Sequence, residues 1–133
     1  MMSGQDEETR LYQAVCDRRI PEALELLSQG TSCNVQKEKG KTALHEAMHI
    51  DYIETEEGIQ LIREMLKCGA SCNVQDRWGQ TPVHQALRYL KRNSRDRWLG
   101  LVREMLSCGA NCNLQDRLGE TPLHRAAKCL KRQ

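Results

Sequence analysis

The sequence predicts an all-α fold, a solenoid of stacked helix–turn–helix units joined by β-hairpin-like loops. Three observations lead to this prediction. Short blocks of sequence recur three times at nearly constant spacing, and their apolar residues follow the i, i+3, i+4 spacing of amphipathic helices. The chain of 133 residues also lacks Phe, so aliphatic, Met, Ala and Cys side chains must build its core. These side chains suit thin helical layers better than an aromatic-rich sandwich or barrel.

The recurring blocks keep one register along the chain. The first block is GTSCNVQ at 30–36, GASCNVQ at 69–75 and GANCNLQ at 109–115, so successive copies lie 39 and then 40 residues apart. A second block begins ten residues after each first Gly, as GKTALHEA at 40–47, GQTPVHQA at 79–86 and GETPLHRA at 119–126. Two blocks that return together three times indicate a structural repeat.

Each repeat contains the start and stop signals of two helices. Apolar residues at helical spacing precede the first block, in ALELLSQ at 23–29, IREMLKC at 62–68 and VREMLSC at 102–108. The Gly that follows each segment suits the left-handed backbone at a helix C-terminus. In the second block, Thr is a good N-cap, and Pro is tolerated at the first helical position.

These blocks resemble ankyrin repeats, whose pattern runs Asp-x-x-Gly-x-Thr-Pro-Leu-His-x-Ala-Ala, then Leu-Leu, then Gly-Ala-Asp-x-Asn. The resemblance covers about residues 9–131. It implies an ankyrin-repeat solenoid whose first helices and hairpin tips form a concave binding face. We expect a disordered N-terminus at 1–8 and one ankyrin-repeat domain at 9–133, divided into a cap at 9–30, repeats at about 31–69 and 70–109, and a partial repeat at 110–133.

Two departures from the ankyrin pattern affect the expected structure. The copies are longer than the usual period of about 33 residues, and the extra residues fall between the two helices, at 50–57 and 91–98. We expect lengthened first helices with longer inter-helix loops. The 50–57 insertion is acidic and the 91–98 insertion is basic, so neighbouring insertions can neutralise each other. Lys37 also replaces the Asp of the other two hairpins, which predicts an atypical first hairpin.

The repeated histidines and cysteines are assigned structural roles. His45, His84 and His124 each lie three residues after an N-cap Thr, where an imidazole can bond the cap. The pairs Cys68/Cys72 and Cys108/Cys112 have zinc-like spacing. However, repeats stack about 10 Å apart, and Cys72 and Cys112 occupy framework positions, so we expect no metal site. The sequence contains no nucleophile motif or phosphate loop, which predicts a non-enzymatic protein without a cofactor.

Composition indicates a cytoplasmic or nuclear protein. No apolar run approaches the roughly 20 residues that span a bilayer, and the N-terminus lacks the pattern of a secretory signal. We therefore expect no membrane association, and we expect the seven cysteines to be reduced. Residues 1–66 carry 13 acidic and 7 basic side chains, a balance of −6, whereas residues 67–133 carry 5 acidic and 13 basic, a balance of +8.

The expected function is that of a protein-binding scaffold or inhibitor, acting as a monomer through the concave face of hairpins and first helices. The resemblance implies a protein partner such as a transcription factor or a kinase. The alternative is a nucleic-acid-associated module that uses the basic C-terminal half. Trp78 is the strongest single candidate, because an aromatic residue beside Arg77 is typical of interaction hot spots. The predicted partner-binding residues, which occupy non-framework positions, are Lys39, Arg77, Trp78, Gln80, Gln85, Arg88, Tyr89, Arg117, Leu118, Glu120 and Arg125.

Overall fold

The computed structural model describes residues 4–88, 95–124 and 127. Within these residues the chain forms helices joined by turns and loops, and no strand is assigned. The predicted all-α solenoid is confirmed. The elements are α1 Gly4–Cys16, α2 Ile20–Ser28, the 3-10 helix η1 Glu38–Gly40, α3 Ala43–Ala47, α4 Ile50–Ile53, α5 Glu56–Lys67, α6 Pro82–Leu87 and α7 Arg95–Ser107.

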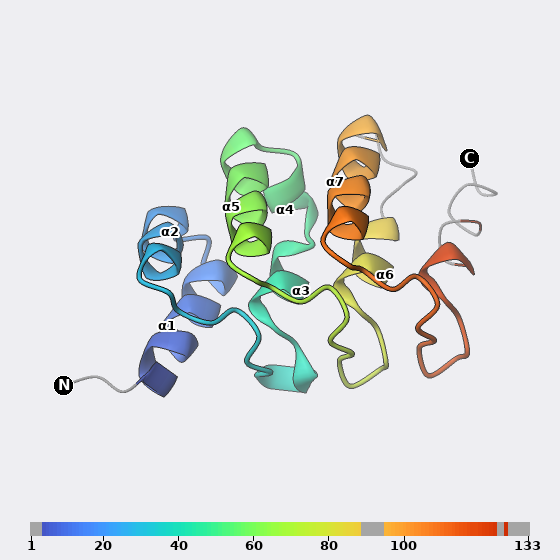
Figure 1. Ribbon diagram of the computed structural model, residues 1–133, viewed down its shortest axis with the longest axis horizontal. Coiled ribbons are helices and arrows are strands. Elements are labelled where there is room, and N and C mark those ends of the chain that lie inside the picture. Colours follow the sequence, from blue (N-terminus) through green and yellow to red (C-terminus); the bar gives the residue numbers. More distant parts are fainter. Residues whose placement is uncertain (1–3, 89–94, 125–126, 128–133) are drawn as a thin grey trace.

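The helices form two rows along the molecule. The second helices of the units, α2, α5 and α7, lie side by side in one row, while α1, α3 and α6 form the other (Figure 1). The long loops between units all project from the same side, and α1 lies at the opposite end of the stack from the hairpin at 116–120. Contacts between α1 and α3, α2 and α5, and α3 and α6 join consecutive units. Each unit therefore covers its apolar faces with its neighbours, as expected for a solenoid.

The ends of the second helices follow from local sequence. The backbone at Gly30, Gly69 and Gly109 has φ of 87°, 93° and 97°, a region that residues with a β-carbon rarely adopt. At the opposite end of α5, the hydroxyl of Thr55 accepts a hydrogen bond from the backbone N–H of Gly58 at 3.0 Å. The glycines thus mark where each second helix ends, and the Thr55 cap marks where α5 begins.

The core is continuous through the stack and is built mainly from aliphatic side chains, as the absence of Phe requires. Leu44 and Val83, at equivalent positions of two units, are both fully buried. Leu123 occupies the same position in the next unit and is 71% exposed. The same residue type at one repeat position thus has opposite environments, depending on whether another unit packs against it.

Two expectations about the ends of the elements were wrong. Helix α1 begins at Gly4, so residues 4–8 are helical rather than disordered; acidic side chains such as Glu7 and Glu8 favour the positive N-terminal end of a helix. The first helix α3 is short, with 5 residues, instead of lengthened. The extra residues of this unit form the separate helix α4 and the start of α5. Residues 91–94 of the second insertion lie outside the described residues.

A glycine makes room for α4. A β-carbon on Gly58 of α5 would lie 1.9 Å from the carbonyl oxygen of Tyr52, so α4 can pack this closely only against a residue without a side chain. Tyr52 is itself buried, and its hydroxyl donates a hydrogen bond to the carbonyl oxygen of Val15 at 2.5 Å. In the next unit, 40 residues later, the large side chain of Trp98 takes the place of Gly58 and is fully buried. The two units therefore accommodate their insertions differently.

Candidate functional site

Two of the hairpins that carry the candidate residues are closed by hydrogen bonds to an aspartate side chain. Asp76 and Asp116 are buried, and one carboxylate oxygen of each accepts hydrogen bonds from the backbone N–H groups two and four residues later, at 2.9 to 3.0 Å. Lys37 cannot accept such bonds. In its loop the chain forms η1 instead, and Lys39 adopts φ of 59°. The first hairpin is therefore atypical, as its sequence predicted.

A histidine connects each helix start to the next hairpin. The backbone N–H of Thr42 donates to Nδ1 of His45 at 3.1 Å, so Nε2 carries the proton and donates to the carbonyl oxygen of Gln80 at 3.0 Å. His84 has the same arrangement, with Nε2 2.9 Å from the carbonyl oxygen of Glu120. The structural role predicted for these histidines is confirmed. Burial lowers the pKa of His45, so the buried imidazole is neutral.

Amide side chains hold the successive loops together. Asn34 donates to the carbonyl oxygen of Gly69 at 3.1 Å and accepts from the backbone N–H of Ser71 at 2.7 Å. Asn73 repeats this bridge to the following unit. Gln36 donates to the carbonyl oxygen of Gln75 at 3.1 Å, and Gln75 does the same to Gln115 at 2.9 Å. This ladder gives the row of hairpins a fixed spacing, which a preformed binding surface requires.

The hairpin tips are also bonded directly to each other. The backbone N–H of Arg77 donates to the carbonyl oxygen of Lys39 at 2.8 Å, and that of Arg117 donates to the carbonyl oxygen of Trp78 at 2.9 Å. Contact is close enough that a β-carbon on Gly79 would lie 2.9 Å from the Cα of Asp116. The backbone that carries Trp78 is therefore fixed on both sides.

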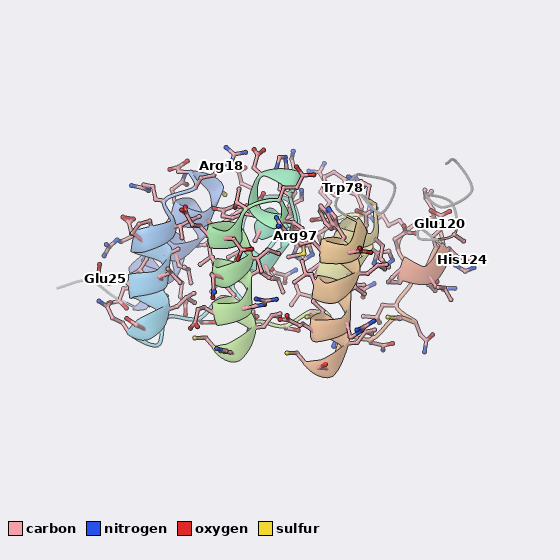
Figure 2. All side chains as sticks on the ribbon, turned by 90° about the horizontal axis from the view of Figure 1, so that it is seen from above. Arg18, Glu25, Trp78, Arg97, Glu120 and His124 are labelled. Atoms are coloured by element: carbon pink, nitrogen blue, oxygen red, sulfur yellow. The ribbon has the colours of Figure 1, made fainter. Side chains whose placement is uncertain are left out.

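One cleft gathers most of the predicted partner-binding residues. It has a volume of about 590 Å³ and lies where three successive hairpins meet α6. We call it the Trp78 cleft, and it is lined by Lys41, Trp78, Gln80, Gln85, Arg88, Asp116, Arg117 and Leu118. Trp78 lies on the side of the first helices, away from the row of α2, α5 and α7 (Figure 2). The structure thus brings residues from three repeats into one site.

Trp78 is half-exposed in this cleft, with 42% of its surface accessible. Three cationic groups surround its ring, with Lys39 Nζ at 5.9 Å, Lys41 Nζ at 6.0 Å and Arg77 Cζ at 5.5 Å from the centroid. At such distances the ring quadrupole attracts each cation weakly. The indole ring remains available for contact, and the nearby charge is strongly positive.

The remaining predicted residues divide into three groups. Lys39 and Arg77 contact the Trp78 ring from outside the cleft lining. Glu120 lies at the C-terminal end of the described chain beside His124 (Figure 2) and accepts from His84 through its backbone carbonyl. Tyr89 and Arg125 lie outside the described residues. Sequence reasoning missed Asp116 as a lining residue because its repeated position indicates a framework role, which it also has.

A smaller cleft of about 100 Å³ adjoins the first. It shares Lys41, Gln85 and Arg88 with the Trp78 cleft and adds Glu46 and His49, among others. Glu46 accepts a hydrogen bond from the Tyr12 hydroxyl at 2.5 Å, and this contact together with burial raises the pKa of Tyr12. The two clefts adjoin through these three shared residues, and Glu46 is the one carboxylate among the residues that line the smaller cleft.

The inserted segments are linked by charge. Arg97, near the start of α7, reaches toward α5 (Figure 2), where its guanidinium lies 4.0 Å from the carboxylate of Glu56 and 3.4 Å from the carbonyl oxygen of Ile53. Arg18 pairs with Asp51 on the other side of α4. The expected neutralisation between insertions is seen for Arg97 and Glu56.

The cysteines do not gather into a metal site within the described parts of the chain, where no group of three or more His, Cys, Asp or Glu side chains could hold an ion. Cys33 and Cys72 are buried, and burial raises the pKa of their thiols to about 12 and about 11. Cys68 and Cys108 are exposed. None of the helices in the described residues has the length and apolar character needed to cross a membrane.

The comparison with protein families agrees with this geometry. The family model for ankyrin repeats, in three copies, matches residues 11–96. The chain belongs to the ankyrin-repeat family. No curated protein sequence matches it. Ankyrin repeats are generally protein–protein interaction modules, and the family is typically non-enzymatic.

Proposed function

We propose that this ankyrin-repeat protein is a non-enzymatic scaffold or inhibitor that binds a protein partner in the Trp78 cleft. The observation that carries the proposal is the position of Trp78. It is a large apolar side chain, 42% exposed, on a hairpin that is hydrogen-bonded to both neighbouring hairpins. The equivalent residues of the other copies are Lys39 and Leu118, so the repeat fold does not require Trp here.

The composition of the cleft supports a protein partner. Aromatic and Arg side chains are enriched at the energetic centres of protein interfaces, and Trp78, Arg88 and Arg117 all line this cleft. Gln80 and Gln85 add amide groups that can hydrogen-bond a peptide backbone. A preformed surface of this kind loses little conformational entropy on binding.

The family resemblance favours a transcription factor or a kinase as the partner. We also propose that the protein is located in the cytoplasm or the nucleus. The location is supported by Cys33, Cys68, Cys72 and Cys108, which are free thiols in the described chain. The localisation is tested by fractionating cells that produce the tagged protein. Recovery from the secreted or membrane fraction would contradict it.

The binding proposal is tested by affinity capture with the wild-type protein, Trp78→Ala and Leu99→Ala, followed by mass spectrometry. Leu99 lies on α7, in the other row of helices, and has the same exposed fraction of 42% as Trp78. We expect partners that the wild type and Leu99→Ala both retain and Trp78→Ala loses. Equal retention by Trp78→Ala, with unchanged helicity in circular dichroism, would refute the proposal.

A further inference from the structure

We infer that the Trp78 cleft takes an extended acidic peptide segment, in which an apolar side chain covers the Trp78 ring and Asp or Glu side chains contact the surrounding cations. The inference rests on the proposed function and specifies the chemistry of the partner. It depends on three features of the cleft: its uncompensated positive charge, its apolar surface, and the positions of its own carboxylates.

The first feature is uncompensated charge. Lys39, Lys41, Arg77 and Arg117 lie around or in the cleft, and none of them forms an ion pair with another described residue. These four cations lie on three successive hairpins around one cleft, so together they attract a negatively charged ligand.

The cations of the helical side of the molecule differ in this respect. Arg63 on α5 pairs with Glu104 on α7 at 2.8 Å, and Lys67 lies 3.6 Å from Glu64. Arg18 and Arg97 also have carboxylate partners. Several cations on the helical side thus have carboxylate partners, whereas these four cations around Trp78 have none among the described residues.

The second feature is the apolar surface. Trp78 and Leu118 occupy equivalent positions of two successive hairpins, and Leu118 is 79% exposed. In an extended peptide, side chains two residues apart lie on the same side and about 6.7 Å from each other. The cationic groups of Lys39, Lys41 and Arg77 lie 5.5 to 6.0 Å from the Trp78 ring centroid. An apolar residue with a carboxylate two positions away on either side matches this spacing.

The third feature separates a peptide from a nucleic acid. Asp116 lines the Trp78 cleft and Glu46 lines the adjoining one. Each strand of duplex DNA carries a phosphate about every 3.4 Å of the helix axis, and every nucleotide of a single strand also carries one, so a strand along this surface would place phosphates near these carboxylates. A peptide can place uncharged residues there and keep its acidic residues beside the cations.

The inference is tested by selecting 12-residue peptides from a random phage-displayed library on the intact protein. We expect the recovered peptides to be enriched in Asp and Glu around an aromatic or aliphatic residue. Recovery of basic or uncharged sequences, or no enrichment at all, would overturn the inference. The best peptide is then labelled with fluorescein, and its Kd is measured by anisotropy at low and physiological salt.

Charge-reversal variants locate the contact. Lys41→Glu and Lys67→Glu change the net charge equally, but Lys67 lies on α5, in the other row. We expect Lys41→Glu to weaken peptide binding at least fivefold and Lys67→Glu to change it less than twofold. Truncation at Trp78 should weaken it about thirtyfold, as for an interface hot spot. Equal effects of the two Lys variants, or tighter binding of labelled oligothymidylate than of the peptide, would contradict an acidic peptide site.

The two experiments distinguish a failure of the acidic-peptide inference from a failure of the proposed function. If affinity capture yields partners that depend on Trp78 but the selected peptides lack acidic residues, the binding function stands and the acidic-peptide inference fails. If no captured partner depends on Trp78, the proposed function fails as well.

Discussion

Nε2 of His45 donates a hydrogen bond to the backbone carbonyl of Gln80, 3.0 Å away and 35 residues later in the chain. The bond joins a helix start in one repeat to the hairpin of the next, beside the Trp78 cleft that Gln80 lines. A residue that caps its own helix therefore also positions part of the candidate binding surface. The same histidine in the C-terminal unit, His124, caps its helix but is exposed.

The two environments predict unequal effects of one substitution. We expect His45→Ala to lower the free energy of unfolding by about 2–4 kcal/mol, because it removes buried hydrogen bonds and leaves the carbonyl of Gln80 without its donor. We expect His124→Ala to lower it by less than about 1 kcal/mol, since only an exposed cap is lost. Urea unfolding followed by circular dichroism measures both. Similar losses for the two variants would show that the bridge to Gln80 adds little.

The stability of the protein is expected to fall in mild acid through His45. Burial lowers the pKa of His45 below its ordinary value of 6.5. Between the two pKa values the unfolded chain binds more protons than the folded one, so the free energy of unfolding decreases as pH falls through about 6.5 and levels off below the folded pKa. Above pH 6.5 the imidazole is neutral in both states, and this contribution does not change with pH.

The measurement compares urea unfolding from pH 8 to pH 5 in three proteins. The variant His45→Gln should show a shallower dependence on pH than the wild type. The variant His49→Gln serves as the control, because His49 is exposed on the neighbouring turn, and it should keep the wild-type slope. If His45→Gln and the wild type have parallel pH profiles, the titration of His45 is not linked to folding.

Two helical glycines are expected to respond in opposite directions to Ala. A β-carbon at Gly58 would lie 1.9 Å from the carbonyl oxygen of Tyr52, so Gly58→Ala must displace α4 from α5. We expect Gly58→Ala to lower the free energy of unfolding by about 1–3 kcal/mol, the usual cost of overpacking. At Gly100 on α7 a β-carbon meets nothing within 4 Å, and we expect Gly100→Ala to stabilise the protein by about 0.5–1 kcal/mol through helix propensity. Thermal unfolding of both variants tests this prediction. It is contradicted if both substitutions raise the melting temperature or both lower it.

The position of a leucine in the stack should decide its contribution to stability. We expect Leu44→Ala to cost about 2–5 kcal/mol, because Leu44 is fully buried between units. We expect Leu123→Ala to cost less than about 1 kcal/mol, because Leu123 is 71% exposed at the end of the described stack. Chemical denaturation of the two variants provides the comparison. A large loss for Leu123→Ala would mean that its side chain is covered in solution.

Much of the fold could be predicted from residues that specify local geometry. Thr42 and His45 in their cap, Gly30 at its helix end and Asp76 in its hairpin each act over a few residues, so their roles follow from sequence spacing. The three-fold recurrence of these signals determined the solenoid. The substitution of Lys37 for Asp likewise predicted a different first hairpin, which the structure shows as η1.

Only the tertiary structure decided how the inserted residues fold and which surface residues share a site. Helix α4 depends on the fit between the backbone of Tyr52 and Gly58, which spacing does not reveal. Lys41 and Arg117 lie 76 residues apart in the sequence and line one cleft because three hairpins are stacked by hydrogen bonds from Arg77 to Lys39 and from Arg117 to Trp78. Local signals are written within a few residues, whereas packing and charge balance depend on distances that exist only after the units have stacked.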